Sequence, residues 1–230
     1  MPRKARIIVP NCPHHIVQRG HNRNAVFVTE QDYQYYLENL KEFKREFDIK
    51  VNAWCLMTNH VHLILEPGDD KKSVSRLMKR LAGRQSAYVN KLERRTGTLW
   101  EGRFKASPIQ RDEYLLPCVR YIEMNPVRAC MVASTEEYKW SSYHERTGVR
   151  NDGVLDLDAC FIGLSKNRLE RIKRYKKFIL ENVSDVEMKL LHESVKRNQL
   201  TGNNRFTDEI ERRVGIRVEN RGRGRPLLDK

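Results

Sequence analysis

The 230-residue chain lacks any apolar run approaching the ~20 residues that a membrane-spanning helix needs. It also has few cysteines: the five are scattered and form no C-x-x-C pair. This excludes a disulfide framework and a ribbon-type zinc site, and it suits a reducing compartment. The first residues carry basic charge but no apolar segment typical of a secretory signal. We therefore expect a cytoplasmic protein that makes no contact with a membrane.

Acidic residues are scarce relative to basic ones. The chain has 44 Lys and Arg against 30 Asp and Glu, a formal net charge of +14. This excess of positive charge predicts a polyanionic partner. Nucleic acid is the leading candidate, and an acidic membrane surface is the second. Hydrophobic residues make up 39% of the chain, which is enough to build a core and argues against a disordered protein.

Hydrophobic periodicity predicts the order β-α-β-β-α-β-α in the first two thirds of the chain. The expected strands span 14–20, 49–56, 60–66 and 100–108. The expected helices run from 30 to near 47, from 73 to near 97, and from 112 to near 121. This order predicts an α+β fold, in which a four-stranded antiparallel sheet carries helices on one face in the ferredoxin-like plan.

A shift toward Gly, Asn and Asp near residue 150 predicts a boundary. We expect a first domain at 1–148, a linker at 149–165, and a basic helical region at 166–230. In that region a capping box at Ser184 and the residues Thr207 and Asp208 each predict a helix start. The segment Arg223–Pro226, RGRP, resembles the core of an AT-hook, and a solvated basic tail is the alternative.

His60-Val61-His62 is the most informative triplet. Side chains alternate along a strand, so both imidazoles share one face of the predicted sheet. They could be metal ligands, phosphate contacts, or exposed histidines without a role. Imidazole alone favours zinc, with a third ligand from elsewhere.

Tyr121 stands in the segment VRYIEMNP, four residues before Asn125. Helical spacing places the two side chains on one face, with Arg120 and Arg128 nearby. The tyrosine is either a packed ring or, beside a metal and arginines, a nucleophile for phosphoryl transfer.

Four segments together resemble a known family. HHIVQRGHNR, NAWCLMTNHVHLIL, GTLWEGRFKASPI and VRYIEMNPVRA follow one another in an order and spacing similar to those of the REP-associated tyrosine transposases, within the single-tyrosine HUH group. The resemblance covers Ile7 to Thr147. Pro117 departs from the pattern because it lies inside the predicted tyrosine helix and lacks a backbone donor.

The resemblance implies a metal-dependent endonuclease and strand transferase that acts on single-stranded palindromic hairpin DNA. It implies Tyr121 as the nucleophile, a 5′-phosphotyrosine intermediate, and His60, His62 and Asn125 as ligands of Mg²⁺ or Mn²⁺. We expect no small-molecule cofactor, a monomer or homodimer, and a nucleoid-associated location. The candidate DNA contacts are Arg19, Arg23, Arg103, Lys105, Arg120, Arg128, Arg223 and Arg225.

Two other functions are consistent with the sequence. One is a non-catalytic nucleic-acid-binding regulator derived from a transposase. RNA binding of the RRM type is disfavoured, because no expected strand carries the aromatic-rich RNP1 pattern of such domains. The other is a phosphoesterase that uses paired histidines directly on phosphate. It would need a second histidine motif in another strand, and HHIV is the only one. We expect residues 166–230 to raise DNA affinity without contributing to the chemistry.

Overall fold

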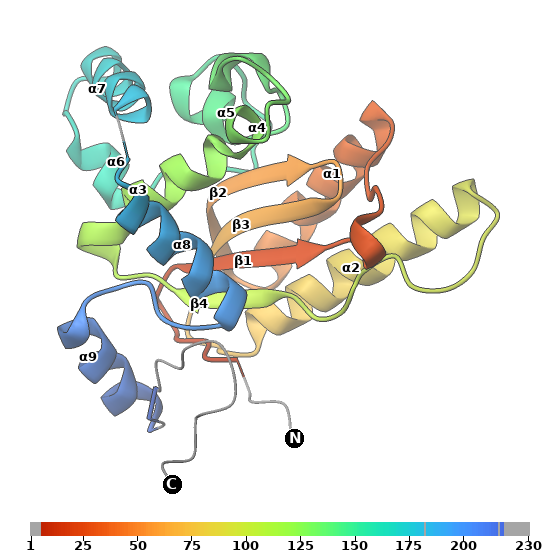
Figure 1. Cartoon of the computed structure of the whole chain (residues 1–230), viewed down its shortest axis with the longest axis horizontal. Helices are drawn as coiled ribbons and strands as arrows, with labels where there is room; N and C mark the ends of the chain where they lie inside the picture. The colour runs from red at the N-terminus through yellow and green to blue at the C-terminus, as the bar shows by residue number, and fades with distance from the viewer. Residues whose placement is uncertain (1–5, 182, 216, 219–230) are drawn as a thin grey trace, which may run out of the picture.

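The computed structural model describes residues 6–181, 183–215 and 217–218. Its sheet contains β1 (His14–Arg19), β2 (Ile49–Met57), β3 (His60–Pro67) and β4 (Lys105–Pro108), paired antiparallel in the order β2-β3-β1-β4 (Figure 1). The predicted α+β class and antiparallel sheet are confirmed. The last strand is shorter than predicted, because Trp100 forms an isolated bridge with Gly20 and the ladder to β1 begins only at Lys105.

Two long helices cover one face of the sheet. They are α1 (Glu30–Glu46), which begins with a capping box formed by Thr29 and Asp32, and α2 (Ser73–Leu92). Their apolar stripes are buried against the sheet, as amphipathic periodicity requires. The helix α2 ends at Leu92 rather than near residue 97, and Arg94 just beyond it has a φ of 49°, which is incompatible with continued α-helix.

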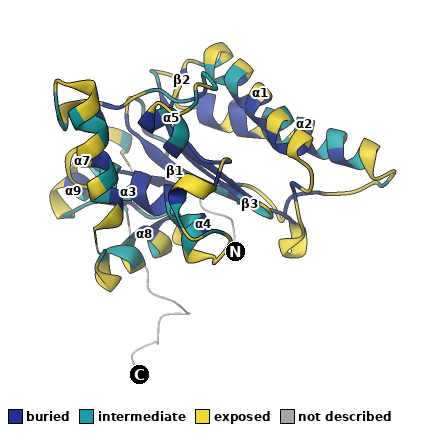
Figure 2. Ribbon diagram, turned by 90° about the horizontal axis from the view of Figure 1, so that it is seen from above, coloured by how far each residue is buried: buried dark blue, intermediate teal, exposed yellow. Residues whose placement is uncertain are grey.

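The opposite face of the sheet carries α3 (Arg111–Glu123) and α8 (Asp185–Arg197), so helices lie on both sides of it (Figure 2). The expectation of helices on a single face holds for α1 and α2 and is wrong for these two. Pro117 lies within α3 without ending it. Helical backbone continues through Met124 into the short α4 (Asn125–Arg128).

The rest of the chain packs around this frame. It contains η1 (His21–Arg23), η2 (Thr135–Glu137), α5 (Tyr143–Thr147), α6 (Ala159–Gly163), α7 (Arg168–Leu180) and α9 (Asn204–Val214). The capping Ser184 starts α8 as predicted. The start predicted at Thr207 and Asp208 is wrong, because the Asn203 side chain accepts a hydrogen bond from the Phe206 amide and caps α9 earlier.

The hydrophobic core extends past the predicted boundary near residue 150. Phe161, Tyr175, Ile179 and Leu191 are buried in the same cluster as the sheet residues. Within the segment predicted as a linker, Asp158 forms an ion pair with the fully buried Arg146. Helices α6, α7 and α8 therefore contribute side chains to the core of the first part of the chain.

Two negative predictions can be compared with the structure. In the part of the chain that is described, no helix is both long enough and apolar enough to cross a membrane. All five cysteines are free thiols, and three of them are buried.

Candidate active site

Three histidines meet on the sheet face that α3 and α8 cover. The register pairs Val17 with His62 and Arg19 with His60, so His15, His60 and His62 point to the same side. The His60 and His62 ring centroids are 4.9 Å apart, and those of His15 and His62 are 5.2 Å apart. A hydrogen bond of 2.9 Å joins Nε2 of His15 to Nδ1 of His62.

Burial keeps these imidazoles neutral. It lowers the pKa of His15 to about 3 and that of His60 to about 4, and Arg19 acts in the same direction on His60. The pKa of His62 falls well below its ordinary value, for the same reason and because His60 and His15 adjoin it. Nδ1 of His60 contacts Oδ1 of Asn59 at 2.6 Å. Nδ1 of His60 and Nδ1 of His62 are therefore both occupied by hydrogen bonds. In each ring, Nε2 is the nitrogen that would bind a metal ion.

Tyr121 projects from α3 onto this cluster. Its ring centroid lies 5.7 Å from that of His15 and 6.1 Å from that of His62, and the residue is only 4% exposed. Burial raises the pKa of the Tyr121 phenol, while Arg128, whose guanidinium carbon lies 4.8 Å from the ring centroid, and Arg19 oppose that rise. The hydroxyl is therefore a protonated, weak nucleophile at neutral pH.

Asn125 begins α4, one helical turn after Tyr121. Its amide nitrogen Nδ2 is buried and has no hydrogen-bond partner. The nitrogen and oxygen of an amide exchange places on a 180° flip, which would put a hard oxygen ligand at this position. Within the described ranges no three His, Cys, Asp or Glu side chains are arranged to hold a metal. Neutral imidazoles and an amide oxygen are nevertheless ligand types that a divalent ion accepts.

One residue of the site comes from the far end of the chain. Nδ1 of His192, on α8, lies 3.2 Å from the hydroxyl oxygen of Tyr121. Helix α8 contacts β4, β1 and α3, which brings the imidazole over the tyrosine. Three elements distant in sequence therefore converge on one phenol.

Comparison with known proteins is consistent with this arrangement. The family model described as "Transposase IS200 like" matches residues 8–125, just over half of the chain. A curated relative, the REP-associated tyrosine transposase of Escherichia coli (strain K12), is 30% identical over 125 residues, which are 54% of this chain and 71% of the relative. The chain belongs to the IS200-like transposase family. The resemblance to REP-associated tyrosine transposases is confirmed.

A solved structure shares the transposase fold. It is a REP-associated tyrosine transposase bound to a REP hairpin, with a TM-score of 0.57 and 22% identity, and the match covers 69% of this chain and 96% of that one. At this identity the match shows the fold alone. The family model ends at residue 125 and leaves α8 with His192 outside it.

Five of the predicted basic residues lie at the end of the sheet that carries His60. Arg19 ends β1 opposite His60, and Arg128 covers the Tyr121 ring. Lys105 and Arg103 lie at and before the start of β4, where the 100–104 segment runs beside β1. Arg23 follows β1 in η1, and its carbonyl accepts a hydrogen bond from the Asn59 side chain. We call Arg19, Arg23, Arg103, Lys105 and Arg128 the basic rim.

The structure separates Arg120 from this set. Its side chain is 6% exposed, and its guanidinium donates to the Phe178 carbonyl and to Glu187, at 3.1 Å in each case. The interpretation of Arg120 as a DNA contact is therefore corrected to a tie between α3, α7 and α8. Arg223 and Arg225, with the rest of the RGRP segment, lie outside the described residues.

Two residues of the candidate site, His15 and His192, were not predicted from the sequence. His15 lies two residues before Val17, which pairs with His62, so strand alternation places His15 beside His62 once β1 and β3 are paired. His192 carried no such signal, since nothing local in the sequence marks α8 as a neighbour of α3. The contact between His192 and Tyr121 shows that the region after residue 166 contributes a side chain to the candidate site.

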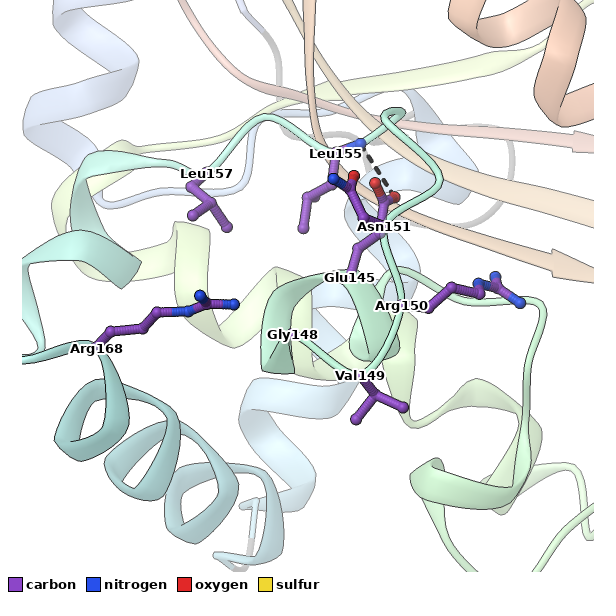
Figure 3. Close-up of a pocket in the computed structure, with 8 residues that line it drawn as sticks. All are labelled: Glu145, Gly148, Val149, Arg150, Asn151, Leu155, Leu157 and Arg168. Carbon is purple, nitrogen blue, oxygen red and sulfur yellow. Dashed lines mark hydrogen bonds between the residues drawn. The ribbon is translucent and has the colours of Figure 1, made fainter.

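One surface cavity lies away from these residues. It measures about 420 Å³ and lies between α5, the 149–157 segment and Arg168 of α7 (Figure 3). Glu145 there accepts hydrogen bonds from the amides of Val154 and Leu155 and fixes the loop. None of the histidines of the site, nor Tyr121, lines this cavity, so we do not place the chemistry there.

Proposed function

We propose that this transposase cleaves and rejoins single-stranded DNA through a covalent tyrosine intermediate. The observation that supports the proposal most directly is that Tyr121 is held against His15 and His62 on one face of the sheet. A tyrosine, a pair of neutral imidazoles and an arginine within one site suit phosphoryl transfer, where positioning and charge neutralisation supply most of the rate.

In cleavage, the Tyr121 oxygen attacks the scissile phosphorus in line. The bond from that oxygen to phosphorus forms and the bond from phosphorus to the 3′-oxygen breaks, leaving a 5′-phosphotyrosine and a 3′-hydroxyl. Arg128 and Arg19 adjoin the tyrosine and would offset the negative charge of the phosphate. Rejoining is the reverse attack by a 3′-hydroxyl on the phosphotyrosine.

His60, His62 and Asn125 would hold a divalent cation, which we propose to be Mg²⁺ or Mn²⁺. When bound, the cation supplies positive charge to a non-bridging phosphate oxygen. The orphaned Asn125 amide and the neutral state of both imidazoles support this assignment. Adduct formation in Mn²⁺, Mg²⁺, Zn²⁺ or EDTA tests it: full activity in EDTA would reject the metal, and stimulation by Zn²⁺ alone would favour the tetrahedral alternative.

The substrate we propose is a short imperfect palindrome folded as a hairpin, with single-stranded flanks. The structural neighbour is bound to a REP hairpin. Arg128 and Arg19 of the basic rim adjoin the tyrosine. The rim as a whole would offer phosphate contacts to an unpaired strand, so binding should weaken steeply with salt as counterions are released.

The decisive experiment incubates the protein with single-stranded palindromes and Mn²⁺ and looks for a covalent adduct on a denaturing gel. Tyr121→Phe removes the attacking oxygen and keeps the ring, so it should abolish the adduct while leaving hairpin affinity nearly unchanged. Tyr114→Phe on the same helix is the matched control and should still form the adduct. Hairpin binding by the wild type without any adduct would instead support the non-catalytic regulator.

A further inference from the structure

The hydroxyl of Tyr121 has a hydrogen-bond partner that the family model does not include. His192 lies at 3.2 Å from it through Nδ1, on a helix 71 residues further along the chain. The tyrosine is 4% exposed, whereas His192 is exposed on its other side. The imidazole thus connects a buried phenol with solvent.

The other histidines of the site are committed elsewhere. Nε2 of His15 is bonded to His62, and its Nδ1 is buried without a partner. His60 and His62 are the residues that we assign to the cation. His192 is therefore the imidazole best placed to exchange a proton with the phenol.

The charged surroundings of His192 keep its ring neutral. Burial lowers the pKa of His192; Lys196 on its own helix, Arg128 on α4 and Arg19 on β1 lower it further, and Glu193 opposes them. His15 on β1 and Tyr121 on α3 are the remaining titratable neighbours. A neutral imidazole has one unprotonated nitrogen, which can accept the proton of the phenol.

We propose that His192 is a catalytic residue that accepts the Tyr121 hydroxyl proton during cleavage and returns it during rejoining. The assignment rests on the proposed function above. In cleavage the proton moves from the tyrosine oxygen to Nδ1 as the bond to phosphorus forms, and the departing 3′-oxygen takes a proton from water. In rejoining the 3′-hydroxyl loses its proton to water, and the imidazolium protonates the departing tyrosine oxygen.

Single-turnover adduct formation by the full chain in Mn²⁺ tests this role. His192→Gln keeps a hydrogen-bonding side chain but cannot take up a proton. We expect it to slow the adduct about 10²–10⁴-fold at pH 7.5, the usual contribution of a general base, with hairpin affinity within about twofold of wild type. The control His144→Gln removes a histidine of α5 bonded to the Glu136 carbonyl and should leave the rate unchanged.

The pH profile separates a base from a purely structural contact. The wild-type rate should level off above the lowered pKa of His192. In His192→Gln it should keep rising about tenfold per pH unit, because only ionised tyrosine then reacts. Added imidazole should partly restore His192→Ala. Wild-type rate and profile in His192→Gln would overturn the proposal, as would a faster rate, which would show that the contact restrains the tyrosine.

A measurement without substrate gives a second test. ¹⁵N-histidine NMR at pH 7.5, with the His192 signals identified by their loss in His192→Gln, should show Nδ1 unprotonated and Nε2 protonated. A protonated Nδ1 would donate to the tyrosine oxygen and would overturn the proposal. If wild type forms no adduct on any palindrome, the proposed function fails and this inference with it; equal adducts in wild type and His192→Gln refute the inference alone.

Discussion

Nε2 of His15 and Nδ1 of His62 lie 2.9 Å apart, between neighbouring strands on one face of the sheet. If the proton of this bond resides on His62 Nδ1, Nε2 of His62 presents a lone pair in a fixed direction. A hydrogen bond to the non-ligating nitrogen of a metal-bound histidine generally orients the ring and raises its basicity. In that tautomer His15 would act as a positioning residue for the proposed cation site.

We predict that His15→Ala weakens Mn²⁺ binding about 10–100-fold, the usual effect of removing such a partner. His15→Gln retains an acceptor and should recover part of that affinity. Calorimetric titration of Mn²⁺ measures both, and unfolding in urea shows whether each variant is folded. Unchanged Mn²⁺ affinity in a folded His15→Ala variant would contradict the positioning role.

A second prediction concerns Arg120, which is bonded to Glu187 and the Phe178 carbonyl. Arg120→Leu should lower the free energy of unfolding by about 1–3 kcal/mol, because hydrogen bonds to a charged group are lost and Glu187 is left unpaired. The salt dependence of hairpin binding should stay the same. Arg128→Ala on the basic rim is the contrasting variant and should weaken hairpin binding with little loss of stability. A reduced salt slope in Arg120→Leu would restore the original interpretation of Arg120 as a DNA contact.

Local patterns in the sequence were sufficient for the sheet and its histidine pair. Alternation in HVHLIL predicted that His60 and His62 share a face, and the register of β3 confirms it. The helix expected from residue 30 to near residue 47 matches α1, because a capping box at Thr29 and an apolar stripe through Tyr36 and Leu40 depend on neighbours within a turn or two. These features are determined by short-range geometry, which a single sequence contains.

Contacts between distant elements could not be predicted in this way. The position of His192 against Tyr121 depends on how α8 crosses β4 and α3, and no local periodicity encodes that crossing. The same holds for Arg146, whose partners Glu123 and Asp158 belong to separate elements. The shift toward Gly, Asn and Asp near residue 150 predicted a domain boundary, but it did not show that the next helices return to the same core.

The third prediction follows from that shared core. A chain ending near Arg150 loses Asp158 and Tyr175, which leaves Arg146 and Glu123, both with fully buried side chains, partly unpaired. Unpaired buried charge is strongly destabilising, typically by about 3–5 kcal/mol, so the truncated chain should lose cooperative thermal unfolding. A chain ending at Val218 is the control and should melt as wild type does. A folded, cleaving product of residues 1–150 would confirm the expectation from sequence that the later region contributes only affinity.

The last prediction concerns acid stability and His14. This residue is fully buried, Nε2 accepts a hydrogen bond from the Val9 amide at 3.0 Å, and burial lowers its pKa to about 4. Below pH 6.5 the unfolded chain binds a proton at His14 that the folded chain does not bind. The free energy of unfolding therefore decreases as the pH is lowered from about 6.5 to about 4. At about 1.4 kcal/mol per unit of pKa shift, His14 alone should account for roughly 2–3 kcal/mol of stability lost between pH 7.5 and 4.5.

His14→Gln keeps an acceptor for the Val9 amide but cannot be protonated, so its stability should fall less steeply over this range. Buried His15 and His62, whose pKa values are also lowered, act in the same direction in both proteins, and their contribution cancels when the two curves are subtracted. Urea unfolding at pH 7.5 and pH 4.5 measures the difference. Parallel loss of stability in wild type and His14→Gln would show that His14 is protonated at the same pH in the folded and unfolded chains.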